Sequence, residues 1–204
     1  MLESRPWFRD RPLRQKGARL VSPDEIRQWV EAFDSGDDGR ASASRRDILA
    51  LLDGTRRPDT RTQFQPGHVT VSGLVLSDDG DAVLLVLHAR LGRWLQPGGH
   101  LEPSDRSIVD AARREVREET GILVEGEPEP TLVGLDVHDI PAARGEPAHR
   151  HHDLMFRFVS PRHPPRPGPG ALRAEWCAVG RLEELGVDAA LRAALARAGL
   201  RGSR

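Results

Sequence analysis

The chain has 204 residues, which is enough for one domain and a smaller appendage. Its formal net charge of −1 at pH 7 gives no electrostatic reason to expect binding to nucleic acid or to an anionic membrane. Cys177 is the only cysteine, which excludes an internal disulfide. Residues 1–10 lack the apolar run of a signal peptide, and no apolar stretch is long enough to cross a membrane. We therefore expect a cytoplasmic protein.

Residues 1–65 are predicted to form a helical N-terminal extension and linker, separate from a domain over residues 66–204. Residues 22–25 form a capping box with proline at the first helical position, and an apolar stripe of Ile26, Trp29, Val30 and Phe33 follows. Residues 36–39 should end this helix, and residues 44–52 should form a second one. We interpret the two helices as a hairpin packed on the main domain. The alternative is a module that binds a partner or forms a homodimer.

The main domain begins with two predicted strands, residues 68–76 and 82–87, joined by a turn. Residues 94–99 read as a strand end that runs into a glycine turn, where the backbone bends sharply or approaches a ligand closely. Further strands are expected over residues 131–140, 153–160 and 175–179, followed by a last amphipathic helix over residues 188–198.

A helix is predicted between these strands, beginning near residues 104–107, where Ser and Asp can cap it. Its buried stripe is formed by Val109, Ala112 and Val116, and Gly121 fits the position just past its end. The carboxylates of Glu115, Glu118 and Glu119 lie at i, i+3 and i+4 beside that stripe, within one helical turn. Carboxylates this close repel one another unless a hard cation such as Mg²⁺ neutralises them. The simpler alternative is a solvated charged face interleaved with arginines.

This segment resembles the signature of the Nudix hydrolases, G-x5-E-x7-R-E-U-x-E-E-x-G-U, where U is aliphatic. The second half matches in full, with residues Arg114, Glu115, Val116, Glu118, Glu119, Gly121 and Ile122. The first half is out of step by one residue, which we interpret as an insertion around residues 105–107 that leaves Gly99 and Glu102 in their family roles. Asp105 should then face the carboxylates or cap the helix, and Arg106 should point to solvent or substrate.

The resemblance implies a Nudix fold of the α/β class, a mixed β-sheet sandwiched between helices. It also implies Mg²⁺-dependent hydrolysis of a diphosphate bond in a nucleoside diphosphate linked to another group, with Mn²⁺ as a substitute. The implied metal ligands are Glu115, Glu118 and Glu119, and the implied catalytic residues are Glu118, Glu119 and Arg114. The implied contacts to substrate include Gly98, Gly99 and Glu102.

A histidine-rich strand adds a second group of candidates. His149, His151 and Asp153 alternate and should share one face, whereas His152, Leu154, Phe156 and Phe158 should share an apolar face. We assign His149 and His151 to substrate binding. The alternatives are a zinc site, which no cysteine or acidic partner at finger-like spacing supports, and an ordinary polar face. We interpret residues 136–139 as lining the edge of the site.

Two functions are compatible with the sequence, a hydrolase and a Nudix-like sensor that binds a nucleotide without cleaving it. Sensors of this kind commonly lose signature carboxylates and carry a DNA-binding appendage. This chain keeps all three glutamates of the second half, and its N-terminal helices show no basic stripe, which favours the enzyme. The substrate subclass stays open: for example, the tyrosine used by dinucleoside-polyphosphate hydrolases is missing, because the chain has no tyrosine.

Overall fold

The computed structural model describes residues 21–124, 129–143 and 145–200. The predictions made for residues 1–10 lie outside this range. The described helices are α1 (Pro23–Ala32), α2 (Gly39–Gly54), α3 (Ile108–Thr120) and α4 (Ala189–Arg197), with a short 3₁₀ helix at Val179–Arg181. The strands are β1 (Gly67–Ser77), β2 (Ala82–His88), β3 (Trp94–Leu95), β4 (Gly98–His100), β5 (Thr131–Ile140), β6 (His149–Ser160) and β7 (Ala171–Ala178). Among the described helices, none is long and apolar enough to cross a membrane.

The strands form one mixed sheet with β1 at its centre. The order along the sheet is β3-β2-β1-β6-β5, with β4 paired to β1 and β7 paired to β2. β1 runs parallel to β6 over its whole length, from Gly67 opposite Arg150 to Ser77 opposite Ser160. Its other partners, β2 and β4, are antiparallel to it. β1 is buried along its whole length because it has partners on both edges and helices near both faces.

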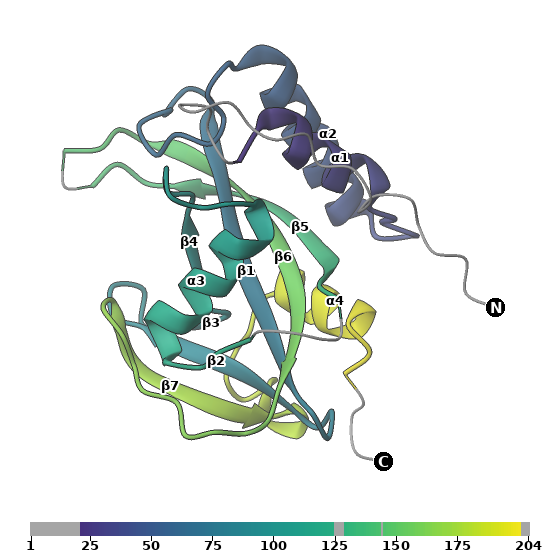
Figure 1. Cartoon of the computed structure of the whole chain (residues 1–204), viewed down its shortest axis with the longest axis vertical. Coiled ribbons are helices and arrows are strands. Elements are labelled where there is room, and N and C mark those ends of the chain that lie inside the picture. Colours follow the sequence, from purple (N-terminus) through teal and green to yellow (C-terminus); the bar gives the residue numbers. More distant parts are fainter. Residues whose placement is uncertain (1–20, 125–128, 144, 201–204) are drawn as a thin grey trace.

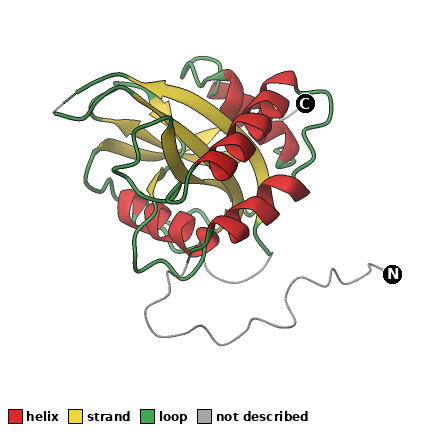
Figure 2. Cartoon of the chain, turned by 90° about the horizontal axis from the view of Figure 1, so that it is seen from above, coloured by secondary structure: helices red, strands yellow, loops and turns green. Residues whose placement is uncertain are grey.

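Two apolar cores lie on opposite faces of this sheet, so the sheet is held between helices (Figures 1 and 2). The larger core joins α1, α2 and α3 to side chains such as Val71, Leu154 and Phe156. The smaller core joins α4 to side chains such as Leu74 and Leu85. This arrangement confirms the predicted class, a mixed sheet between helices with a helical N-terminal extension.

The two N-terminal helices pack directly on the sheet and on α3. The ring of Trp29 meets Phe156 edge-on at 5.1 Å between centroids. Glu25 accepts a hydrogen bond at 3.1 Å from the backbone N–H of Ile108, the first residue of α3. A carboxylate in this position stabilises α3, because the first N–H groups of a helix have no partner within it. The hairpin interpretation is thus confirmed in its packing, whereas the division of the chain after residue 65 stays a prediction.

Most strands lie where the sequence places them, and the differences concern element ends and one short strand, β4. β5 has the predicted bounds. β6 starts at His149, before the predicted residue 153, and β7 starts at Ala171, before the predicted residue 175. Helix α2 begins before the expected residue 44 because Asp38 accepts hydrogen bonds from the N–H groups of Arg40 and Ala41. Gly98–His100, read as a turn, is instead a short strand that pairs with β1.

The loop over residues 161–170 holds the C-terminal end of α3. Its backbone N–H groups at Arg166 and Gly168 donate to the carbonyls of Thr120 and Glu119, at 2.7 and 2.9 Å. A Cβ at Gly168 would lie 1.8 Å from the carbonyl oxygen of Glu118, so only glycine allows this approach. The loop therefore supplies partners to helix-end carbonyls that would otherwise have none.

Candidate functional site

Helix α3 is anchored at both ends and along one side. The Ser107 hydroxyl accepts from the N–H of Asp110 at 3.0 Å, and Gly121 ends the helix in the left-handed conformation with φ 71°. The predicted stripe of Val109, Ala112 and Val116 is buried. Because the helix docks through this side, its polar residues are left at the neighbouring side, where β4 lies.

Arg114 connects most polar groups around this helix. Its guanidinium donates to both oxygens of Asp105, at 2.9 and 3.1 Å, and to the carbonyl of His100 at 2.8 Å. It also donates to Glu115 at 2.8 Å and to Glu118 at 3.2 Å. Burial lowers the pKa of Arg114, but the hydrogen bonds to Asp105 and Glu115 outweigh it, so the net pKa is raised and the charge is kept. Arg114 therefore fixes the orientation of two of the three signature glutamates.

The two residues at the insertion, Asp105 and Arg106, differ in their contacts. Asp105 is buried, binds Arg114 and accepts from the N–H of Glu102 at 2.7 Å, whereas Arg106 is exposed. The predicted contrast between these two neighbours is confirmed. The details differ from expectation, because Ser107 caps the helix and Asp105 reaches the carboxylates only through Arg114. The exposed Glu102 side chain lies 3.9 Å from Arg114.

Two of the three glutamates lie against the glycines of β4. Glu119 accepts from the N–H of Gly98 at 3.1 Å, and a Cβ on Gly99 would lie 2.7 Å from the Glu115 carboxylate. Burial raises the pKa of Glu119 to about 7, with repulsion from Glu115 and Glu118 adding to it and the Gly98 N–H opposing it. Burial also raises the pKa of Glu115, against the effect of Arg114. Both carboxylates are thus held where their negative charge is unfavourable without a cation.

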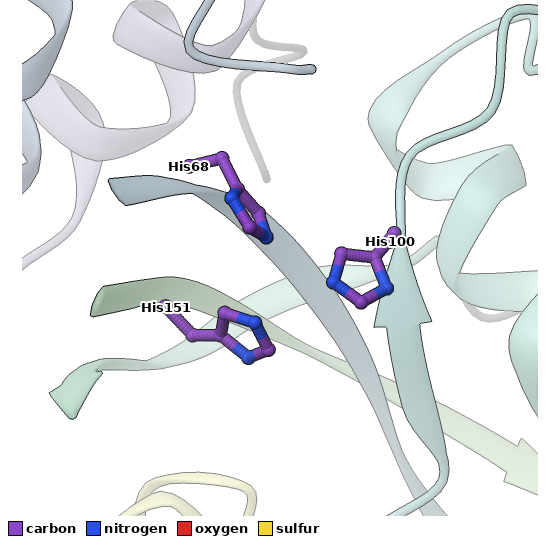
Figure 3. Close-up of side chains that lie close together, drawn as sticks. All are labelled: His68, His100 and His151. Atoms are coloured by element: carbon purple, nitrogen blue, oxygen red, sulfur yellow. The ribbon is translucent and has the colours of Figure 1, made fainter. Parts of the chain in front are cut away.

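β4 separates these carboxylates from a second polar group. Gly99 faces Glu115, and because side chains alternate along a strand, the next residue, His100, faces the other way. There the ring of His100 lies 5.0 Å from His68 of β1 and 5.1 Å from His151 of β6, between centroids (Figure 3). Neighbouring strands therefore bring together histidines that are far apart in the sequence.

The predicted face of β6 forms part of this group. The His149 ring lies 5.0 Å from His68 and 5.2 Å from His151, and His138 of β5 lies 5.6 Å from His151. Asp153, the third member of the predicted face, is buried and accepts from Thr70 and Ser72 of β1 at 2.9 and 2.6 Å. The opposite face packs in the larger core, as predicted, through Leu154, Phe156 and Phe158.

Sequence reasoning did not single out His68 or His100. His68 is the second residue of β1, and His100 follows the two signature glycines. Neither lies in a spacing typical of metal ligands. Only the strand pairing could have indicated them, because β1 places His68 opposite His151 and Thr70 opposite His100.

The two groups differ in how closely their ligand atoms meet. Within the described residues, one set of three metal-binding side chains has all its ligand atoms within 4.8 Å of one another: His68, His100 and His151. The signature glutamates do not form such a set, because the Arg114 guanidinium lies between Glu115 and Glu118. Glutamates and histidines are thus two distinct candidate metal centres on opposite sides of β4.

A shallow surface depression lies beside α3 on its solvent side. It is lined by Arg106, Asp110, Arg113, Arg114, Arg117, Leu123 and Val124. Four of these residues are arginines, whose guanidinium groups suit phosphate oxygens. The lining gives this side of the signature helix a positive character.

Comparison with known proteins shows which family the chain belongs to. The family model of the NUDIX domain matches residues 66–198, well over half of the chain. The chain therefore belongs to the Nudix family. It is also 48% identical over 54 residues to an uncharacterized Nudix hydrolase, YvcI of Bacillus subtilis (strain 168). That match covers 26% of this chain and 33% of the relative, so it spans only about a third of the relative's length.

A solved structure shows the same fold. The NUDIX domain of Shewanella oneidensis NrtR, solved in complex with ADP ribose, matches with a TM-score of 0.53 and 16% identity. That match covers 74% of this chain and 96% of the other. A MutT protein from Bacillus halodurans matches with a TM-score of 0.45 and 28% identity, over 57% of this chain and 72% of the other.

Proposed function

We propose that this protein hydrolyses a diphosphate bond in a nucleoside diphosphate linked to another group, with Mg²⁺ as its cofactor and Mn²⁺ as a substitute. The observation that carries the proposal is the joint placement of the signature glutamates and glycines. Glu115 and Glu119 lie against Gly99 and Gly98, and Arg114 ties Glu115 and Glu118 together. Membership of the Nudix family supports the same reaction class.

The proposed metal ligands are Glu115, Glu118 and Glu119. Carboxylate oxygens are the ligands that Mg²⁺ prefers, and the raised pKa values of Glu115 and Glu119 show two carboxylates whose charge a cation would stabilise. Glu118 is the most exposed of the three, with 45% of its side chain accessible. When bound, Mg²⁺ would neutralise the diphosphate oxygens and make a coordinated water more acidic.

The chain's own residues supply positioning and proton transfer. We assign Glu118 and Glu119 as the candidates that take the proton of the attacking water, because a carboxylate next to that water can act as its general base. Arg114 orients Glu115 and Glu118 through charge-assisted hydrogen bonds. The hydrogen bond from Arg114 to Glu118, at 3.2 Å, is longer than that to Glu115, at 2.8 Å.

The proposed substrate contacts are Gly98, Gly99, Glu102, His149 and His151. The two glycines let the backbone of β4 approach a diphosphate closely. The arginine-lined depression beside α3 supports an anionic substrate. We propose a small nucleotide as the partner, with neither nucleic acid nor membrane involved, and a homodimer as the state to test by light scattering.

A turnover screen tests this function. Purified protein is offered nucleoside triphosphates, sugar nucleotides, ADP-ribose and dinucleotides, each with Mg²⁺, with Mn²⁺ and with excess EDTA. We expect hydrolysis of at least one class that depends on the divalent ion and stops in EDTA. Full activity in EDTA would refute the metal mechanism. Tight nucleotide binding without turnover in any metal would instead support the sensor alternative.

A further inference from the structure

Three histidines from three strands converge on the side of β4 away from the signature glutamates. His68 comes from β1, His100 from β4 and His151 from β6, and Figure 3 shows their rings turned toward one another. Their ligand atoms all lie within 4.8 Å of one another. A point equidistant from three such atoms lies at most about 2.8 Å from each, whereas Zn–N bonds are about 2.0–2.1 Å. Ring rotations that move each nitrogen by about 0.7 Å would close the difference.

An independent observation concerns His68, which is 1% exposed. Its Nδ1 lies 3.0 Å from the carbonyl oxygen of Gln63, which can only accept, so Nδ1 carries the proton. Nε2 then holds a lone pair, and this buried atom has no hydrogen-bond partner. A buried acceptor without a partner costs about 1–3 kcal/mol, so its retention calls for an explanation. A carbonyl on Nδ1 that leaves Nε2 free is the arrangement found around metal-bound histidines.

The other two rings are suited to the same role. His100 and His151 both lie close to His68, with ring centroids at 5.0 and 4.9 Å. Imidazole nitrogens are common ligands of late first-row divalent cations. The adjacent rings of His149 and His138 do not belong to the set of three whose ligand atoms all lie within 4.8 Å of one another.

We propose that His68, His100 and His151 form a binding site for a late first-row divalent cation, with Zn²⁺ as the best match. Neutral imidazoles suit Zn²⁺, whereas Mg²⁺ requires oxygen ligands. Three protein ligands leave the fourth tetrahedral position for water or another small ligand. The site is separate from that of the signature glutamates, since Gly99 and His100 face opposite sides of β4. It makes His151 an ion ligand in place of a direct substrate contact, and it does not depend on the proposed hydrolase activity.

Zinc titration of the full chain tests the site. Protein stripped with a chelator and dialysed into excess Mg²⁺, which occupies the glutamates, is titrated with Zn²⁺ by calorimetry. We expect one Zn²⁺ per chain and a rise in Tm with Zn²⁺. X-ray absorption should show nitrogen ligands near 2.0–2.1 Å. Absence of stoichiometric binding, or a ligand shell made only of oxygens, would overturn the proposal.

Variants assign the ligands. His100→Asn and His151→Asn, which are less buried than His68, should each weaken Zn²⁺ binding by at least about 100-fold, because loss of a mere supporting contact already costs 10–100-fold. The controls are His163→Asn, an exposed histidine of the loop over residues 161–170, and Glu118→Gln. Both controls should bind Zn²⁺ as the unmodified chain does. Unchanged affinity in the folded His151→Asn variant, or loss of the stoichiometric site in Glu118→Gln, would assign the ion elsewhere and refute the proposal.

Discussion

The glutamate group on α3 and the histidine group on the sheet are assembled in opposite ways. Glu115, Glu118 and Glu119 belong to a single helical segment, so their proximity follows from helix geometry alone. His68, His100 and His151 belong to three strands and meet only through strand pairing. A site on one helix can therefore be recognised from local sequence spacing, whereas a site on a sheet depends on the register between segments that are distant in the sequence.

The two groups also differ in charge. Burial raises the pKa of Glu119 and lowers that of His151, so in each case it favours the neutral form. For the carboxylates, neutrality opposes metal binding, and a cation has to compete with the proton. For the imidazoles, neutrality is the metal-binding form. Desolvation therefore favours the metal-binding form of the histidines, whereas the glutamates reach their metal-binding, charged form most readily when a cation is present.

The largest effect is expected at the glutamate group. Glu118→Gln preserves shape and helix propensity but removes a ligand charge, so turnover should fall by about 10²–10⁴-fold. The free energy of unfolding without metal should stay the same or rise slightly, because repulsion among the carboxylates decreases. Steady-state kinetics and urea unfolding measure the two quantities. Glu184→Gln, at a side chain that is 74% exposed, is the matched control. Preserved turnover with reduced stability would show a structural role for Glu118.

The two glycines of β4 should separate catalysis from folding. In Gly99→Ala the new Cβ meets the mobile end of Glu115, so the fold should persist while displacement of the carboxylate lowers turnover by about 10²-fold. In Gly98→Ala the Cβ meets the carbonyl of Val71 and the Cβ of Ser72, both at 2.6 Å, so stability should fall by about 1–3 kcal/mol. Thermal unfolding and kinetics on both variants test this. Equal loss of stability in the two would contradict the assignment of Gly99 to the site.

A smaller effect is expected at the site of the insertion. Asp105→Asn keeps the shape but removes the buried charge that faces the partly buried Arg114, and should lower the free energy of unfolding by about 1–3 kcal/mol. Arg106→Ala, at the exposed neighbour, should change it by no more than about 0.5 kcal/mol. Urea titration of both variants gives the comparison. The reverse ranking would show that Arg106, and not Asp105, occupies the signature position.

The smallest effect concerns the edge of the histidine group. The hydrogen bond to Asp136 raises the pKa of His138 above its ordinary value of 6.5. Its stabilising contribution is therefore complete below pH 6.5 and lost as pH rises through the folded-state pKa. In Asp136→Asn the pKa of His138 should fall. The free energy of unfolding should decrease by less than about 1 kcal/mol, because His138 is half exposed. An NMR titration of metal-free protein measures it, and an unchanged pKa would refute the pairing.

Much of the fold could be predicted because its signals are local. Periodicity located β1, β2, β5 and α3, and the cap residues Ser107 and Gly121 fixed the ends of α3. β4 was missed because three residues with two glycines have no strand propensity, and pairing with β1 alone makes them a strand. The early start of α2 at Gly39 was missed because glycine is a weak helix former, and the cap at Asp38 outweighs this.

The candidate site also has a part that local sequence predicts and a part that it does not. Arg114 and the three glutamates follow from the signature, and the contrast between Asp105 and Arg106 followed from counting residues in it. His149 and His151 were found through alternation along one strand. His68 and His100 could not be found, because they meet His151 only through the pairing register of β1 with β4 and β6. No local sequence pattern encodes that register. The roles assigned to these residues remain predictions until the variants above are measured.

The parallel pairing of β1 with β6 has a consequence for how the molecule forms. Thr70 and Asp153, which bond across it, are 83 residues apart in the chain. β1 therefore leaves the ribosome long before its central partner exists, and no turn of the kind that joins β1 to β2 can bring the two together. Chains dominated by such distant contacts fold slowly, because the conformational entropy of the intervening loop is lost before the contacts form. The three histidines come from β1, β4 and β6, so on this topology their group can be completed only after β6 has paired with β1.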